Sequence, residues 1–205
     1  MVTPAMQLPG SLKNQYYVMR HGDSLANRAG IIASHPDNGV PRFGLSEVGR
    51  QQVLAEISDS QLLESTRIIC SDFKRAHETA EIAHRNLDCK QTITLEKRLR
   101  ERSFGELELC SDRRYAEVWS ADQQQLNKSD IGVETVESVL YRGLDLIFEL
   151  EAEFNECSFL LIAHGDVLQI MQTAFARMPV HRHRDLPHLK TGELRLLNSL
   201  AGHDL

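Results

Sequence analysis

The stretch Tyr16-Tyr17-Val18-Met19-Arg20-His21-Gly22 indicates the fold, because four largely apolar residues lead directly into an arginine, a histidine and a glycine. An apolar run of this length is typical of a strand that is covered on both faces of a parallel sheet. In open parallel sheets, ligands bind beyond the carboxyl ends of the strands. The sequence therefore predicts that Arg20 and His21 lie at a ligand-binding edge.

Short apolar runs alternate with helical patterns along the rest of the chain, and this alternation is the signature of a βαβ architecture. The predicted strands cover residues 16–19, 67–70, 92–95, 159–163 and 193–197. Helical patterns begin after Ser46 and continue in residues 76–87, 136–154 and 167–175. We predict one α/β domain over residues 1–205, a three-layer α/β/α sandwich around a mostly parallel sheet.

Residues 105–132 interrupt the alternation. The segment is polar, and its main apolar anchors are Tyr115 and Trp119. We expect a small helical insertion that resembles a lid and partly roofs the site.

The composition is that of a soluble globular protein, since 41% of the 205 residues are hydrophobic and 25% are charged. The net charge of -6 argues against a nucleic-acid partner and against binding to an anionic membrane surface. No apolar run approaches the roughly 20 residues that a membrane span requires, and the first 15 residues carry no secretory signal. We expect a cytoplasmic protein.

The spacing of cysteines and histidines argues against a metal site. The chain has no C-x-x-C pair among its four cysteines, Cys70, Cys89, Cys110 and Cys157. That pattern also argues against a disulfide framework and fits a reducing compartment. The run 181–185, with His188 nearby, is predicted to be a solvated loop at the rim of the site. We expect neither a metal ion nor another cofactor.

Four further segments place polar residues at the ends of strands or the starts of helices: residues 45–52, 71–76, 99–105 and 163–165. They suit phosphoryl transfer, which depends mostly on positioning and on charge neutralisation by forked guanidinium contacts. His21 would attack as a neutral imidazole, the form that adjacent arginines favour. Glu101 would protonate the leaving alcohol and then act as a base on water.

The order of five sequence blocks resembles that of the histidine phosphatase superfamily, also called phosphoglycerate mutase-like: R-H-G-x-S-x-x-N, L-S-x-x-G-x-x-Q, S-x-x-x-R-A-x-x-T-A, E-R-x-F-G and H-G. The resemblance covers residues 16–197. It implies a phosphomonoesterase that acts through a phosphohistidine intermediate, and a homodimer. Since the insertion should roof the site, a small phosphorylated substrate is favoured over a phosphoprotein.

The resemblance also implies roles for individual residues. His21 matches the nucleophile that becomes phosphorylated, and Glu101 matches the proton donor. The positions that match the phosphate pocket are Arg20, Arg75 and His164, with Asn27 as an accessory contact. Further matches to the substrate-binding region are Gly165, Phe43 and Gly44.

Departures from the family pattern favour a phosphatase over a mutase. Phe43-Gly44 stands where many mutases have a Thr-Gly pair, and Ala26 replaces a common tryptophan. The insertion is short and contains one basic pair, Arg113-Arg114. A mutase-type phosphotransferase is the alternative reaction. The alternative from another class is a non-catalytic protein that binds phosphorylated ligands.

Two further interpretations concern neighbours of the site. Cys70 precedes Arg75 as in cysteine-dependent phosphatases, but the spacing is one residue too short, so Cys70 is interpreted as a buried strand residue. Asp166 is predicted to cap the helix that it begins. Four arginines are candidates for holding a second anionic group of the substrate: Arg28, Arg42, Arg102 and Arg113.

Overall fold

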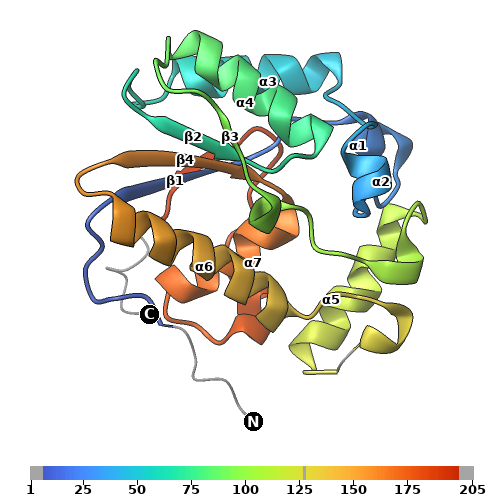
Figure 1. The fold of residues 1–205 in the computed structure, drawn as a ribbon. Coiled ribbons are helices and arrows are strands. Elements are labelled where there is room, and N and C mark those ends of the chain that lie inside the picture. Colours follow the sequence, from blue (N-terminus) through green and yellow to red (C-terminus); the bar gives the residue numbers. More distant parts are fainter. Residues whose placement is uncertain (1–6, 127, 199–205) are drawn as a thin grey trace.

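The computed structural model describes residues 7–126 and 128–198. Its five-stranded sheet has the order β3-β2-β4-β1-β5. Figure 1 labels β1 to β4. The strands are β1 (Gln15–Arg20), β2 (Arg67–Cys70), β3 (Thr94–Leu95), β4 (Ser158–Ala163) and β5 (Leu194–Leu196). β5 pairs antiparallel with β1, and the other pairs are parallel. The predicted α/β/α sandwich with a mostly parallel sheet is confirmed.

Helices cover both faces of this sheet (Figure 1). α3 (Glu47–Ser58) and α4 (Lys74–Asn86) lie together on one face, and α6 (Val136–Glu153) and α7 (Gly165–Phe175) lie on the other. The shorter helices are α1 (Leu25–Ala29), α2 (Pro36–Gly39) and α5 (Tyr115–Gln123). Single-turn or slightly longer 3-10 helices cover Lys97–Leu99, Gly105–Leu107, Asp112–Arg114, Ser129–Ile131 and Val180–Asp185. No helix among these described residues is both long and apolar enough to cross a membrane.

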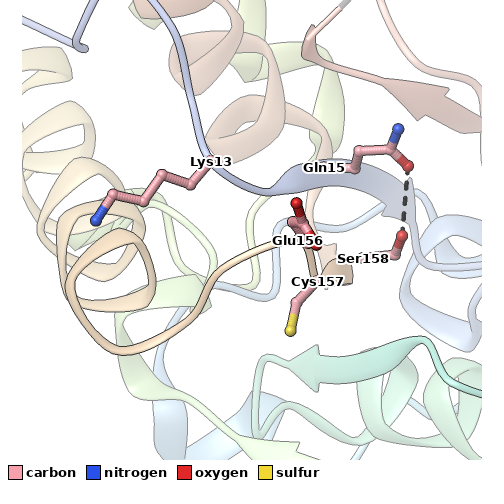
Figure 2. A pocket seen from close by; sticks show the side chains of 5 residues that line it. All are labelled: Lys13, Gln15, Glu156, Cys157 and Ser158. Atoms are coloured by element: carbon pink, nitrogen blue, oxygen red, sulfur yellow. Dashed lines mark hydrogen bonds between the residues drawn. The ribbon is translucent and has the colours of Figure 1, made fainter.

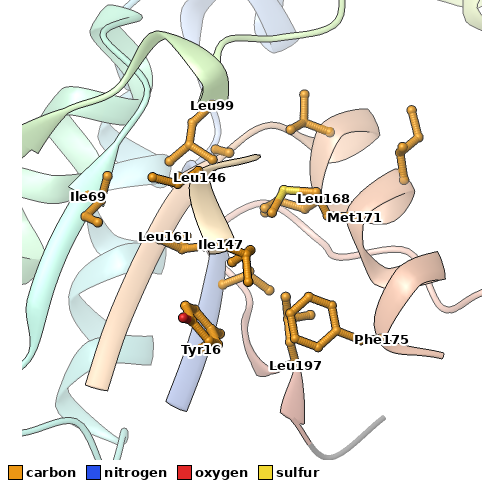
Figure 3. Packing of buried hydrophobic residues seen from close by; sticks show 14 of the residues in the cluster. Tyr16, Ile69, Leu99, Leu146, Ile147, Leu161, Leu168, Met171, Phe175 and Leu197 are labelled. Carbon is orange, nitrogen blue, oxygen red and sulfur yellow. The ribbon is translucent and has the colours of Figure 1, made fainter. Parts of the chain in front are cut away.

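An apolar cluster fixes α6 and α7 against the sheet (Figure 3). Tyr16 of β1 and Leu161 of β4 meet Ile147 of α6 and Met171 of α7 in this cluster, and all four are fully buried. The opposite side of α6 carries Tyr141, which is 55% exposed. Burial of a side chain of this size contributes about 1.5–3 kcal/mol, so the apolar stripe of α6 determines its orientation.

Two local expectations differ from the structure, and a third is confirmed. The strand predicted at 92–95 is reduced to Thr94–Leu95, an edge strand whose two residues are exposed. The run 181–185 is not a solvated loop, because it forms a 3-10 helix in which His183 is buried. α3 begins after Ser46 as predicted, since the Ser46 hydroxyl accepts the backbone N–H of Gly49. Its apolar residues are split, with Val53 buried and Val48 exposed.

The insertion consists of α5 and three 3-10 helices, and it lies with α1 and α2 at one end of the molecule (Figure 1). An isolated antiparallel bridge between Ile31 and Ser111 joins it to the segment after α1, and a second bridge pairs its two flanking residues, Phe104 and Val133. At the amino-terminal ends of the central strands, a surface pocket lies at the start of β1 and β4 (Figure 2). Its lining residues are Lys13, Gln15, Glu156, Cys157 and Ser158.

Candidate active site

The register of β1 and β4 brings two histidines together. Arg20 is paired with Ala163, so the next residue of each strand, His21 and His164, leaves the sheet at the same level. The backbone N–H of His21 donates to the Ala163 carbonyl at 3.0 Å. The two imidazole rings lie edge to face with centroids 5.2 Å apart, and both are buried. The carboxyl edge of the parallel strands therefore carries a histidine pair, as is general for ligand sites in such sheets.

His21 has one ring nitrogen fixed as a donor and the other available as a nucleophile. Its Nδ1 lies 2.8 Å from the Gly22 carbonyl, which can only accept, so Nδ1 carries the proton. Nε2 then has a lone pair, and the Nε–H of Arg75 donates to it at 2.9 Å. Burial, followed by the charges of Arg75 and Arg20, holds the pKa of His21 well below its usual range. The ring is thus neutral, as a nitrogen nucleophile must be.

Three residues beside His21 each carry a buried polar atom without a hydrogen-bond partner among the described residues. These atoms are Nε of Arg20, Nη1 of Arg75 and Nδ1 of His164. Arg20 adjoins His21 in the chain, Arg75 donates to its ring, and His164 contacts it edge to face. Buried polar groups are ordinarily satisfied, so such a group needs an explanation. Together with Nε2 of His21, the three atoms can surround a tetrahedral oxyanion.

The remaining contacts of these three residues fix their orientation. The second guanidinium arm of Arg75 donates to the Ala33 carbonyl at 3.0 Å. Nε2 of His164 lies 3.0 Å from the hydroxyl of Ser71, so Nδ1 can carry a proton toward the site. Arg20 Nη1 lies 2.7 Å from Nε2 of His188 and donates to the Leu189 carbonyl. Sequence reasoning missed the contact with His188, because no local pattern links a residue of this loop to a strand 168 positions earlier.

Glu101 completes the group. One carboxylate oxygen lies 3.8 Å from Nη2 of Arg75 and 3.8 Å from Nδ1 of His164, and the other accepts the backbone N–H of Arg102. Burial raises the pKa of Glu101 to about 7; Arg75 opposes this rise and Asp166 adds to it. A carboxyl group in this range is both an acid and a base near neutral pH.

Two arginines, Arg142 and Arg102, fix the segment that carries Glu101. Arg142 of α6 donates to the carbonyls of Arg98 and Arg100. Arg102 is almost fully buried and makes a forked contact with Asp122 of the insertion, at 2.6 and 2.8 Å. The segment that carries Glu101 is therefore tied both to α6 and to α5.

The candidates for holding a second anion are mostly paired with other residues. Arg102 is committed to Asp122, and Arg28 donates to Asp23 at 2.6 Å. Arg42 lies over the ring of Phe43, with its guanidinium carbon 4.7 Å from the ring centroid. The contact with Asp122 makes Arg102 a structural residue. Arg113 is exposed.

Close approach explains two of the glycines. A Cβ atom on Gly22 would lie 2.4 Å from the carbonyl oxygen of Gly49, so any side chain would push α3 away from the site. A Cβ atom on Gly165 would lie 3.2 Å from the guanidinium of Arg20 and from the ring of His188. Gly165 therefore leaves room for these two side chains at the start of α7.

Asn27, Phe43 and Gly44 lie in the segments that follow β1. Asn27 is exposed, and its side-chain oxygen accepts from the backbone and the hydroxyl of Ser24 in a capping box at the start of α1. Phe43 has φ of 56°. Gly44 packs so closely on Glu78 that a Cβ atom would lie 2.5 Å from its carboxylate.

The prediction that Asp166 caps α7 is wrong. His164 occupies the N-cap position, and no side chain makes a capping hydrogen bond there. The Asp166 carboxylate instead accepts the indole N–H of Trp119 at 2.7 Å and lies 3.3 Å from Arg102. The buried arginine and the indole compete successfully for the carboxylate, so Asp166 joins α7 to the insertion.

Comparison with known proteins assigns a family. The sequence model described as "Histidine phosphatase superfamily (branch 1)" matches residues 16–202. The adenosylcobalamin/alpha-ribazole phosphatase of Salmonella typhimurium is 27% identical, over 80% of this chain and 80% of its own. The probable phosphoglycerate mutase GpmB of Erwinia tasmaniensis is also 27% identical, over 84% of this chain and 79% of its own.

Solved structures share the fold. Bacillus stearothermophilus YhfR superposes with a TM-score of 0.73 at 23% identity, covering 88% of this chain and 89% of its own. A mycobacterial glucosyl-3-phosphoglycerate phosphatase in complex with VO3 gives a TM-score of 0.72 at 23% identity, with 88% of both chains covered.

Proposed function

This chain belongs to the histidine phosphatase superfamily, and we propose that it hydrolyses a small phosphomonoester through a phosphohistidine at His21. The observation that carries the proposal is the arrangement of Arg20, Arg75 and His164. Each presents an unpaired buried nitrogen beside the neutral ring of His21. A phosphate group would satisfy all three nitrogens at once, which is what charge neutralisation in phosphoryl transfer requires.

The first half-reaction transfers the phosphoryl group to the enzyme. The substrate phosphate takes over the Arg75 donor that bonds Nε2 of His21 in the free site. The freed lone pair then attacks phosphorus, and the bond between phosphorus and the ester oxygen breaks. The leaving oxygen takes its proton from Glu101, whose raised pKa keeps a large fraction of the carboxyl group protonated near neutral pH.

The second half-reaction releases phosphate. The Glu101 carboxylate removes a proton from water as the water oxygen attacks phosphorus. The bond between phosphorus and Nε2 breaks, and its electron pair returns to the His21 ring. Inorganic phosphate leaves, and Glu101 is protonated again, so the site is restored.

Phosphatase-named relatives support hydrolysis, and a mutase-named relative makes phosphoglycerate mutation the second candidate. Both reactions share the first half-reaction, but a mutase must hold a bisphosphorylated intermediate. The insertion offers little charge for that purpose, since Arg114 is paired with Glu117 through two hydrogen bonds. We therefore favour water over a second substrate hydroxyl as the acceptor.

The experiment measures release of inorganic phosphate from p-nitrophenyl phosphate in the presence of EDTA. We expect wild-type activity to survive chelation, because the arginines supply the charge that a divalent ion would otherwise provide. His21→Ala should be inactive. Alkaline quenching after labelled substrate should leave the label on His21, and acid should remove it. Full activity in His21→Ala, or no acid-labile adduct, contradicts the proposal.

A further inference from the structure

Tyr115, the first residue of α5, packs against the segment that carries Glu101 and against a tryptophan of its own helix. Its ring lies edge-on to Phe104, with centroids 4.7 Å apart, and Phe104 follows Glu101 by three residues. On the other side it stacks on Trp119, with centroids 5.3 Å apart and planes inclined by 10°. The insertion therefore packs this partly buried ring against the residues that follow Glu101.

Trp119 is itself held in place by two contacts. Its indole N–H donates to Asp166, which follows His164 by two residues. The guanidinium of Arg184 lies 3.8 Å from the centroid of the Trp119 ring. Because the tryptophan is held by Asp166, the tyrosine that stacks on it cannot turn away without loss of aromatic contact.

The hydroxyl of Tyr115 makes no hydrogen bond to any other residue in the part of the chain that the structure describes. The buried Tyr16, by contrast, donates its hydroxyl to Glu151 at 2.7 Å. Burial and then Glu101 raise the pKa of the Tyr115 phenol, and Arg75 opposes the rise. The phenol therefore stays protonated and able to donate a hydrogen bond. Glu101 and Arg75, which act on its pKa, lie 3.8 Å apart in the site described above.

We propose that Tyr115 is a substrate-binding residue whose hydroxyl donates a hydrogen bond to a phosphoryl oxygen of the bound substrate. Trp119 and Asp166 are positioning residues that hold its ring over the site. The proposal rests on the proposed function, since it takes the group bound beside His21 to be a phosphate. A neutral phenol adds a donor without adding charge, so it complements the two guanidinium groups.

The test compares Tyr115→Phe with the wild type and with Tyr141→Phe. The probes are inorganic phosphate and orthovanadate, whose dissociation constants are measured by calorimetry, together with kcat/KM for p-nitrophenyl phosphate. We expect Tyr115→Phe to weaken binding of both anions and to lower kcat/KM by about 3- to 10-fold, the effect of one hydrogen bond. Tyr141→Phe lies on the exposed side of α6 and should change neither quantity.

A double-mutant cycle tests the positioning residues. Trp119→Phe removes the N–H that Asp166 accepts and should weaken phosphate binding in the wild-type background. In the Tyr115→Phe background, the same substitution should have little further effect, because its influence passes through the tyrosine hydroxyl. Additive losses would show that Trp119 acts on the site by another route and would overturn its assignment.

Two outcomes overturn the assignment of Tyr115. In the first, anion binding and kcat/KM are unchanged in Tyr115→Phe. In the second, kcat/KM falls while binding of both anions is unchanged, which would place the hydroxyl on the leaving group. The result is separable from the proposed function. Phosphate binding that depends on Tyr115 in a protein without phosphatase activity would support this inference and contradict hydrolysis.

Discussion

The two ends of the parallel sheet handle buried polar side chains in opposite ways. At the amino end, the carboxylate of Glu151 accepts the Tyr16 hydroxyl at 2.7 Å, the Asn14 side-chain amide at 2.8 Å and the Lys13 backbone N–H at 2.8 Å. All the polar groups of this cluster therefore bond one another. The cluster ties the end of α6 to the start of β1, which is a structural purpose.

At the carboxyl end, buried nitrogen atoms of Arg20, Arg75 and His164 lack partners among the described residues. These nitrogen atoms are available to a ligand, whereas the polar atoms at the amino end are used by the protein itself. Substitutions at the carboxyl end should affect catalysis more than folding, and substitutions at the amino end should do the reverse.

Arg75→Gln should give the largest effect of this comparison. The variant loses the guanidinium that contacts His21 and that binds the phosphate in the proposed reaction, so we expect kcat/KM to fall by about 10²- to 10³-fold. Tm should change little, because burial of the charge already opposes folding and lowers the pKa of Arg75. The control is Arg67→Gln at the other end, where the guanidinium lies over the Phe154 ring. Equal losses of kcat/KM in Arg75→Gln and Arg67→Gln would contradict the contrast between the two ends of the sheet.

Glu101→Gln separates acid catalysis from phosphate binding. Turnover of alkyl phosphates should fall by about 10²-fold, whereas p-nitrophenyl phosphate should lose far less because its leaving group needs little protonation. The exposed Glu106 in the same charged run provides the control variant, Glu106→Gln. Equal losses on both substrates would argue against Glu101 as the acid.

The same substitution tests the raised pKa of Glu101 through stability. In the folded state this carboxyl titrates at about 7 rather than at its usual 4.5, because burial disfavours its ionised form. The folded protein then binds more protons than the unfolded chain between these values, so this contribution to stability is lost as pH rises through about 7. The free energy of unfolding of Glu101→Gln, relative to that of the wild type, should therefore rise by about 3 kcal/mol as pH increases from 4.5 to 7. A constant difference in Tm from pH 5 to pH 8 would contradict this.

The sequence predicts the sheet and the cluster around His21 because both follow from local patterns. The apolar runs before His21 and His164 read as neighbouring strands, and the family blocks place Arg75 and Glu101 beside them. The partners of Arg102 and Asp166 could not be predicted, because these residues meet across 64 positions of sequence and their pairing depends on how the insertion packs. The contact between Arg20 and His188 could not be predicted either, because the two residues are 168 positions apart in the sequence.

Glu151→Gln should lower stability without changing catalysis. The pKa of Glu151 is lowered, because hydrogen bonds from Lys13, Tyr16 and Asn14 outweigh the effect of burial. An amide in its place turns one acceptor oxygen into a donor that faces other donors, and we expect a loss of about 1–3 kcal/mol. Because the folded pKa is lowered, the carboxylate's contribution is present above pH 4.5 and disappears as pH falls through the folded value. Urea unfolding at pH 7 measures the loss, and a reduced kcat/KM would contradict the comparison.

Asn27→Asp should have the smallest effect and tests whether this residue reaches the substrate. Aspartate keeps the oxygen that accepts from Ser24 in the capping box, so Tm should stay within error of the wild type. It replaces the amide N–H₂ with a negative oxygen, which would repel a nearby phosphate. We expect kcat/KM to fall by about 3- to 10-fold, since the residue is exposed and charge effects there are screened. Asn27→Ala, which loses the cap as well, should lower Tm. An unchanged kcat/KM in Asn27→Asp would restrict Asn27 to its capping role and confine phosphate binding to the buried residues.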